Sequence, residues 1–144
     1  MAEGKRPGGL TALAVLNFVF AGLGLLALLA LFALVGAAQH AITLAKESGA
    51  EVHDTVSAGT IYIAIVFGLV RMVTMLIAGI GYLGQKKFLG RTMGNVYAIL
   101  ALADTAIGLA LIHSGFGIGT IIGLVYPVLT LALINGTFKD DLVN

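Results

Sequence analysis

The chain has 144 residues, of which 59% are hydrophobic and only 10% are charged, and its mean hydropathy is +1.05. This balance excludes an ordinary soluble domain and predicts an integral membrane protein. The net charge is only +1, and the basic residues are divided among short loops rather than gathered on one face, so we do not expect nucleic-acid binding. The lack of cysteine excludes disulfides and thiolate metal sites.

Four apolar segments predict an all-α integral membrane four-helix bundle with up-down-up-down topology, built as a single domain. A hydrocarbon core of about 30 Å is crossed by about 20 helical residues. The predicted transmembrane helices span about residues 10–38, 59–83, 89–112 and 117–135, with an outer loop at about 39–58.

The first segment is much longer than the apolar core of a signal peptide, which has about 7 to 15 residues, so we expect it to be retained as a helix. Residues 41–48 predict two further turns above the membrane, ending at Gly49 as a C-terminal capping residue. Asp54 or Ser57 is then expected to cap the start of the second helix.

Three histidines, His40, His53 and His113, are expected on the outer side, where the loop also carries carboxylates. Imidazole and carboxylate groups are ordinary zinc ligands, but this spacing matches no compact metal-binding motif. We therefore expect solvated histidines, and we predict no metal site and no cofactor.

Two opposite charges interrupt neighbouring apolar segments, Arg71 in the second and Asp104 in the third. A charge at the centre of a membrane helix costs about 2.5 to 3.5 kcal/mol on insertion scales, so each needs a partner. The midpoint of the two positions falls between Lys87 and Phe88, within the polar connection 84–91. If this connection is the turn of a helical hairpin, each charge lies roughly 18 Å of helix from the turn. The spacing therefore predicts an Arg71–Asp104 ion pair.

Small residues at helical spacing predict the faces on which membrane helices pack closely. Such residues accompany both charges, and the fourth segment carries glycine at every fourth position. That run suits either packing against the first segment or an interface with a partner, and the sequence leaves both open. The predicted packing glycines are Gly68, Gly108, Gly115, Gly119 and Gly123.

The fourth segment contains Pro127, which is expected to kink the helix after Tyr126 unless neighbouring groups bind the freed carbonyl. An Arg has five donors and a carboxylate about four acceptor sites, so an isolated pair leaves several unsatisfied. Polar groups of the other helices are therefore expected to support the pair. The predicted intramembrane polar cluster comprises Asn17, Arg71, Asp104, Tyr126, Thr74 and Thr105.

Three interpretations of this cluster stay open. In the first, the ion pair is a lock that fixes the helix register. In the second, it opens to pass a proton or ion, or recognises a charged ligand. The third interpretation is that one or both charges pair with a different protein.

Basic residues in the short loops predict the orientation. Lys5 and Arg6 precede the first segment, three basic residues lie between the second and third, and Lys139 follows the fourth. With four crossings, these all lie on one side, so both termini are expected in the cytoplasm. The layout resembles that of small bacterial membrane proteins, which implies the bacterial inner (cytoplasmic) membrane.

The sequence offers little for catalysis. No serine has a convincing base and orienting acid, and no loop is large enough to hold a soluble active site. We therefore expect a non-enzymatic membrane protein that acts as an interaction, accessory or oligomeric subunit. Its expected partners are the lipid bilayer and a homo-oligomer or larger membrane complex, with no nucleic acid. The alternative is a small proton- or ion-coupled transporter or channel that uses Asp104 and Arg71.

Overall fold

The computed structural model describes residues 7–51, 58–111 and 117–142, and the elements within these ranges are all helical. The α-helices are α1 (Gly8–Glu47), α2 (Ala58–Leu83), α3 (Met93–Leu111) and α4 (Ile118–Ala132). Two short π-helices extend them, η1 (Lys87–Thr92) before α3 and η2 (Leu133–Thr137) after α4. The all-α prediction is confirmed, whereas the predictions for His53, Asp54, Ser57, His113 and Gly115 lie outside the described residues.

Three helical stretches in the described part of the chain are long and apolar enough to cross a membrane: Gly8–Glu47, Ile61–Leu83 and Ile118–Thr137. The predicted third crossing, residues 89–112, is not among them. It is divided between the π-helix η1 and the 19-residue helix α3.

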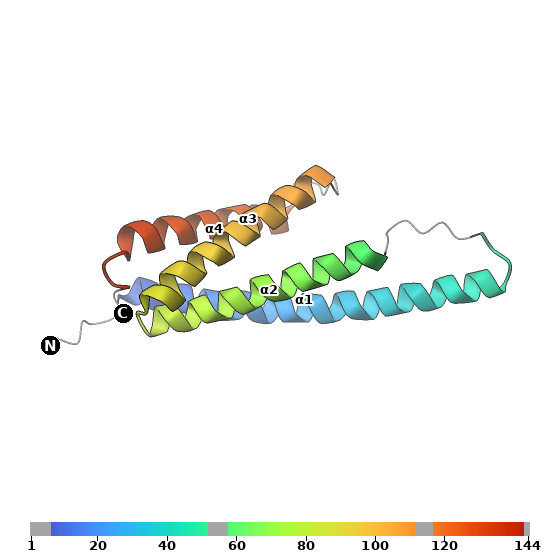
Figure 1. Ribbon diagram of the computed structural model, residues 1–144, viewed down its shortest axis with the longest axis horizontal. Helices are drawn as coiled ribbons and strands as arrows, with labels where there is room; N and C mark the ends of the chain where they lie inside the picture. Colours follow the sequence, from blue (N-terminus) through green and yellow to red (C-terminus); the bar gives the residue numbers. More distant parts are fainter. Residues whose placement is uncertain (1–6, 52–57, 112–116, 143–144) are drawn as a thin grey trace.

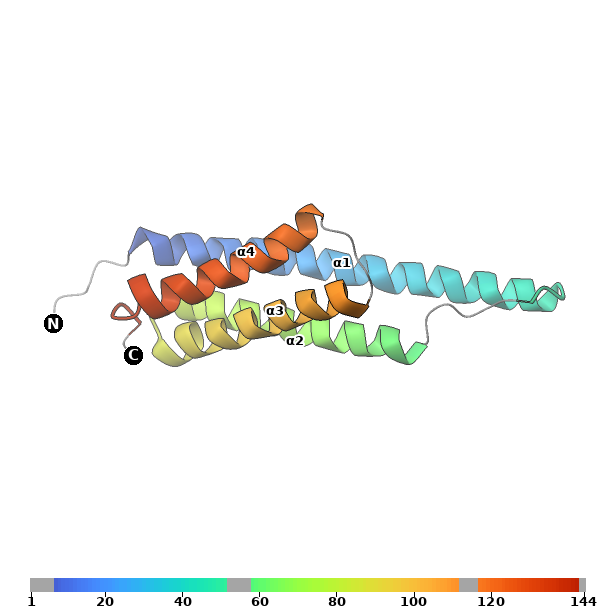
Figure 2. The same cartoon turned by 90° about the horizontal axis from the view of Figure 1, so that it is seen from above.

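The helices lie side by side, and successive ones run in opposite directions (Figures 1 and 2). Helix α1 has 40 residues, so it is about 60 Å long, twice the thickness of a hydrocarbon core. Its last turns project beyond the start of α2 (Figure 1). The helix ends at Glu47, and Gly49 follows with a φ of 80°, a left-handed conformation that suits glycine. The predicted extension and its glycine stop are confirmed.

The connection between α2 and η1 is a tight hairpin. Its backbone closes through a hydrogen bond from Lys86 N to Gly81 O of 2.9 Å, and Gln85 adopts a φ of 50°. Directly after the turn, η1 lies against α2, so that a Cβ at position 81 would overlap the backbone of Leu89 and Gly90. The lack of a side chain at Gly81 thus permits two backbones to touch.

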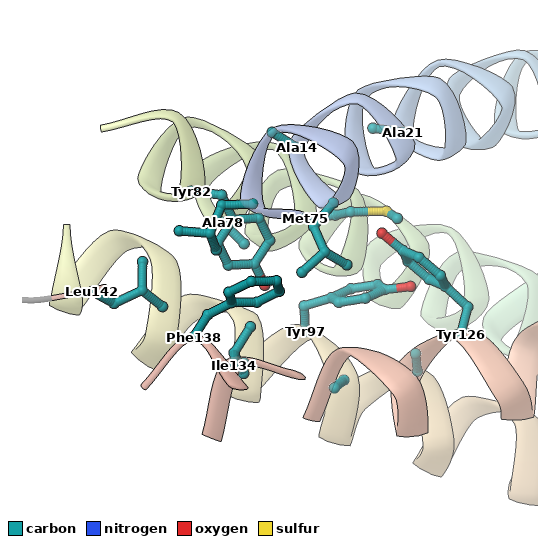
Figure 3. Packing of buried hydrophobic residues seen from close by; sticks show 14 residues of the cluster. Ala14, Ala21, Met75, Ala78, Tyr82, Tyr97, Tyr126, Ile134, Phe138 and Leu142 are labelled. Carbon is teal, nitrogen blue, oxygen red and sulfur yellow. The ribbon is translucent and has the colours of Figure 1, made fainter. Parts of the chain in front are cut away.

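The buried core lies at one end of the molecule, where the hairpin turn and the end of η2 meet the start of α1 (Figures 1 and 3). The buried residues of α1 all fall between Leu10 and Ala21, although the helix continues to Glu47. Towards the other end the helices diverge (Figure 1), and large apolar side chains there are mostly exposed. The core cluster comprises Leu10, Leu13, Ala14, Ala21, Met75, Ala78, Tyr82, Tyr97, Ala98, Ala101, Tyr126, Ile134, Phe138 and Leu142.

Candidate functional site

The predicted ion pair is present and joins α2 to α3. The Arg71 Nη1 atom donates a hydrogen bond of 2.5 Å to Oδ2 of Asp104. The pair is not enclosed, however, because the side chains of Arg71 and Asp104 are 39% and 49% exposed. The pair lies just beyond the packed end, where the helices begin to diverge, so it is internal to the four helices but open on one side.

The ion pair lines a cavity of about 440 Å³ to which all four α-helices contribute. Its walls are mostly apolar or aromatic, and the charged groups in it are Arg71 and Asp104. The lining residues are Phe20, Leu23, Gly24, Ala27, Arg71, Met75, Tyr97, Ala101, Asp104, Thr105, Gly119, Thr120, Ile122, Gly123, Tyr126 and Pro127. An apolar cavity with a few convergent polar groups is the usual form of a binding site.

A second polar contact closes the packed end of this cavity and ties α1 to α2 and α4. Asn17 is fully buried, and its Nδ2 donates to the carbonyl oxygen of Met75 at 3.1 Å. Its Oδ1 accepts a hydrogen bond of 2.5 Å from the Tyr126 hydroxyl. The Tyr126 ring also packs edge-on against Phe20, with centroids 4.8 Å apart, and lies beside Tyr97 (Figure 3).

The polar residues thus form two separate contacts rather than one network. Among the described residues, neither Asn17 nor Tyr126 bonds to Arg71 or Asp104. The Thr74 hydroxyl lies 3.0 and 2.9 Å from the carbonyl oxygens of Val70 and Arg71 in its own helix. The support expected for the ion pair from these groups is therefore not found, since their hydrogen bonds are made elsewhere.

Helix α4 continues through Pro127, because a neighbouring helix binds the carbonyl that the proline frees. Proline removes the hydrogen bond to the residue four positions earlier, which is Gly123. The Thr105 hydroxyl of α3 lies 3.3 Å from this Gly123 oxygen and 2.8 Å from the Ala101 oxygen of its own helix, and its single proton is shared between them. The sequence predicts a kink after Tyr126 unless a neighbouring group binds the carbonyl that Pro127 frees, and Thr105 is such a group.

The predicted packing glycines differ in their surroundings. A Cβ at Gly68 would lie 3.2 Å from Leu28 on α1, and one at Gly123 would lie 2.8 Å from the Thr105 hydroxyl on α3. A Cβ at Gly119 would have no neighbour within 4 Å, so this glycine borders the cavity rather than a described helix. The surroundings of Gly108 and Gly115 lie outside the described residues.

A third polar cluster was not predicted from the sequence. It joins Arg91 of η1 and Asn95 of α3 to Asn135 of η2. The Asn135 Oδ1 atom accepts from Arg91 Nε at 3.1 Å and Asn95 Nδ2 at 3.3 Å, and Asn135 Nδ2 donates to Asn95 Oδ1 at 2.6 Å. The four-residue spacing of Arg91 and Asn95 places both on one helical face, which is the signal that could have indicated it.

The described residues hold no group of three or more His, Asp or Glu side chains arranged to bind a metal ion. What the site offers instead is one cation and one carboxylate in a mostly apolar cavity. Such groups can bind a charged partner or exchange a proton.

Replacing two buried tyrosines should separate a hydroxyl that stabilises the fold from one that does not. The Tyr82 hydroxyl is buried and has no hydrogen-bond partner among the described residues, whereas the Tyr126 hydroxyl bonds to Asn17. We expect Tyr126→Phe to lower the free energy of unfolding by about 1 to 3 kcal/mol, because Asn17 Oδ1 loses its donor. Tyr82→Phe should leave stability unchanged or raise it, because it removes an unpaired polar group.

Thermal melting of the two purified variants in the same detergent, followed by circular dichroism, measures both effects. Each variant loses one oxygen atom from a buried ring, so each is the control for the other. Equal losses of stability would show that the Asn17–Tyr126 hydrogen bond does not stabilise the fold.

In comparisons with known proteins, no family model, curated protein or solved structure matched this chain. The geometry of its own residues is therefore the basis for assigning a function.

Proposed function

We propose that this protein is a non-enzymatic integral membrane subunit that works by associating with other transmembrane helices, as an accessory subunit or as an oligomer. The observation that carries the proposal is the position of the ion pair. Arg71 and Asp104 join α2 to α3, yet they stay half-exposed in a cavity that the core of the chain does not fill.

The cost of exposing charge to lipid supports this proposal. Charged groups in the hydrocarbon region are expensive and normally face protein or water. The rim of the cavity carries apolar side chains, such as Leu23 and Ile122, which are 55% and 45% exposed. A transmembrane helix laid across the opening would cover these side chains and remove the ion pair from lipid. The pair would then link α2 and α3 and also orient the added helix.

The proposed membrane arrangement has four crossings, with α3 as the third and both termini in the cytoplasm of a bacterial cell. Lys86 and Lys87 lie at the α2–η1 turn, and this turn and the end of η2, where Lys139 follows, share one end of the molecule (Figure 1). Clustering of basic residues at one end supports a cytoplasmic position for that end.

A second function, a small proton- or ion-coupled transporter, is favoured by a different aspect of the same cavity. All four α-helices line it, and it contains a carboxylate beside a cation. In this case water rather than a helix would fill the opening, and Asp104 would carry the proton or bind the ion.

Cysteine labelling distinguishes a cavity covered by a helix from one filled with water. The native chain has no cysteine, so a single introduced thiol is the only one that reacts. Gly119→Cys places it at the cavity, where an added Cβ has no neighbour within 4 Å. We expect this thiol to resist a water-soluble maleimide in native membranes and to react fully after unfolding in denaturing detergent.

Two matched variants calibrate the labelling. Lys46→Cys, at the exposed end of α1, should react under both conditions. Gly22→Cys, also exposed on α1 but outside the cavity, should react only after unfolding because lipid surrounds it. Reaction of Gly119→Cys in native membranes as fast as that of Lys46→Cys would refute the covering helix and support the transporter.

A further inference from the structure

A second cavity lies at the opposite end of the packed core from the ion pair, between η1 and the turn that follows η2. It has a volume of about 280 Å³ and is lined by Lys87, Arg91, Lys139, Asp140 and Leu142. Three cationic side chains therefore border it with a single carboxylate. In the part of the chain that the structure describes, none of these three cations forms a salt bridge, so the lining carries more positive than negative charge.

The two walls of this cavity are held in fixed positions. Leu142 is 1% exposed, and it approaches so closely that a Cβ at Gly90 would lie 3.0 Å from its side chain. The turn that carries Lys139 and Asp140 is closed by hydrogen bonds from Lys139 N to Gly136 O and from Asp141 N to Phe138 O. Burial of Leu142 thus anchors this turn against η1, which carries Arg91.

The Arg91 guanidinium is held at this cavity by a hydrogen bond to Asn135. Its Nε donates to Asn135 Oδ1 at 3.1 Å, and Asn135 is in turn bonded to Asn95. Of the five N–H donors of arginine, this bond uses one, and the described residues accept no hydrogen bond from the four on the terminal nitrogens, which a ligand could use. A planar guanidinium held in this way matches two oxygens of a phosphate group at once.

We propose that this cavity binds a phosphate group, presented either by the headgroup of an anionic phospholipid or by a free phosphate ion. Arg91 binds the phosphate oxygens, and Lys87 and Lys139 add positive charge from the two walls. Asp140 limits the excess charge and disfavours a second anion. The site lies at the end of the helices, at the depth of lipid headgroups in the proposed membrane arrangement, where basic pockets select anionic lipids.

The test measures lipid binding by the full-length protein, purified in detergent, through the rise in its melting temperature on addition of short-chain phosphatidylglycerol. Phosphatidylcholine of the same chain length is the comparison, because its phosphate is neutralised by choline. Inorganic phosphate and chloride at matched ionic strength form a separate arm that identifies a free ion as the source.

Lys139→Gln is the informative variant, because Lys139 is exposed and lines the cavity. Lys86→Gln is the matched control, since Lys86 lies at the same end of the molecule, in the α2–η1 turn, and is exposed but does not line the cavity. We expect wild-type protein to prefer phosphatidylglycerol to phosphatidylcholine. Lys139→Gln should weaken this binding about fivefold and Lys86→Gln by clearly less.

Equal effects of the two variants would overturn the proposal, because they would indicate general attraction to a negative surface. No preference for phosphatidylglycerol, together with no response to inorganic phosphate beyond that to chloride, would overturn it as well. A response to phosphatidylglycerol alone supports a lipid headgroup, and a phosphate-specific response that Lys139→Gln reduces supports a free ion. This site does not depend on the role of the ion pair, so either proposal can fail without the other.

Discussion

Gly81→Ala is expected to destabilise the protein by about 3 kcal/mol or more, or to prevent folding. The added methyl group would overlap the backbone atoms of Leu89 and Gly90, where η1 lies directly on α2. Insertion of extra atoms into a packed core typically costs about 1 to 3 kcal/mol, and a backbone gives way less readily than a side chain. The α2–η1 hairpin would have to separate, and Arg91 would move with it.

Gly22→Ala is the matched control for this substitution. Gly22 also lies within a helix, but an added Cβ would have no neighbour within 4 Å. Alanine favours a helix over glycine by about 1 kcal/mol, so this variant should be as stable as wild type or slightly more stable. Unfolding by denaturant in a fixed detergent, followed by circular dichroism, compares the two. Stability of Gly81→Ala equal to that of Gly22→Ala would show that the two backbones are not in contact.

The close contact at Gly81 also illustrates what the sequence does not reveal. The packing glycines that the sequence predicts are marked by their spacing from the charges or from one another, whereas Gly81 and Gly90 touch because a hairpin folds there. Gly90 and Gly94 are themselves four residues apart, a spacing that favours close packing. Glycine spacing can indicate a packed face, but it does not say which helix lies against it.

The Arg71–Asp104 pair, by contrast, was predictable from the sequence. Its prediction needed only the position of one turn and the rise of a helix, and both are local properties. The exposure of the pair was not predictable in the same way. It depends on how far α3 and α4 diverge from α1 and α2 beyond the packed end (Figure 1), and that angle is set by the sum of many side-chain contacts.

The ends of α1 and α2 were likewise predictable because their stop signals are local. Gly49 ends α1 and the polar turn ends α2, as the residue types indicate. The π-helices η1 and η2 were not anticipated, and they bring Arg91 and Asn95 to Asn135. A π-helix differs from an α-helix by a single register shift of its hydrogen bonds, and sequence periodicity does not resolve such a shift.

Reversal of both charges is the prediction that tests whether the ion pair stabilises the protein by linking α2 to α3. Arg71→Ala and Asp104→Ala should each lower stability by about 1 to 3 kcal/mol. This is less than the approximately 3 to 5 kcal/mol expected for breaking a fully buried pair, because both side chains are half-exposed. If the pair acts as a link between α2 and α3, the double variant Arg71→Asp with Asp104→Arg should recover most of this loss in detergent melting.

The recovery follows from the geometry of the contact. The two side chains meet through one hydrogen bond, from Nη1 to Oδ2, and the described residues give neither side chain a bond to Asn17 or Tyr126. An exchange of the two charges therefore disturbs no other hydrogen bond of these polar groups. Failure of the double variant to recover any stability would contradict a linking role for the pair.

Asp104→Asn separates the remaining alternatives, because it keeps the shape of the side chain and removes its charge. A subunit that associates through the covered ion pair should lose stability and assembly with this variant. A transporter should instead remain folded and assembled but lose ion flux into proteoliposomes, and the flux of the wild-type protein should depend on pH. Asp104 borders a cavity that reaches all four α-helices, so its charge is accessible to a partner in the first case and to an ion in the second. Assembly and flux, measured on the same reconstituted variant, therefore identify which of the two the cavity serves.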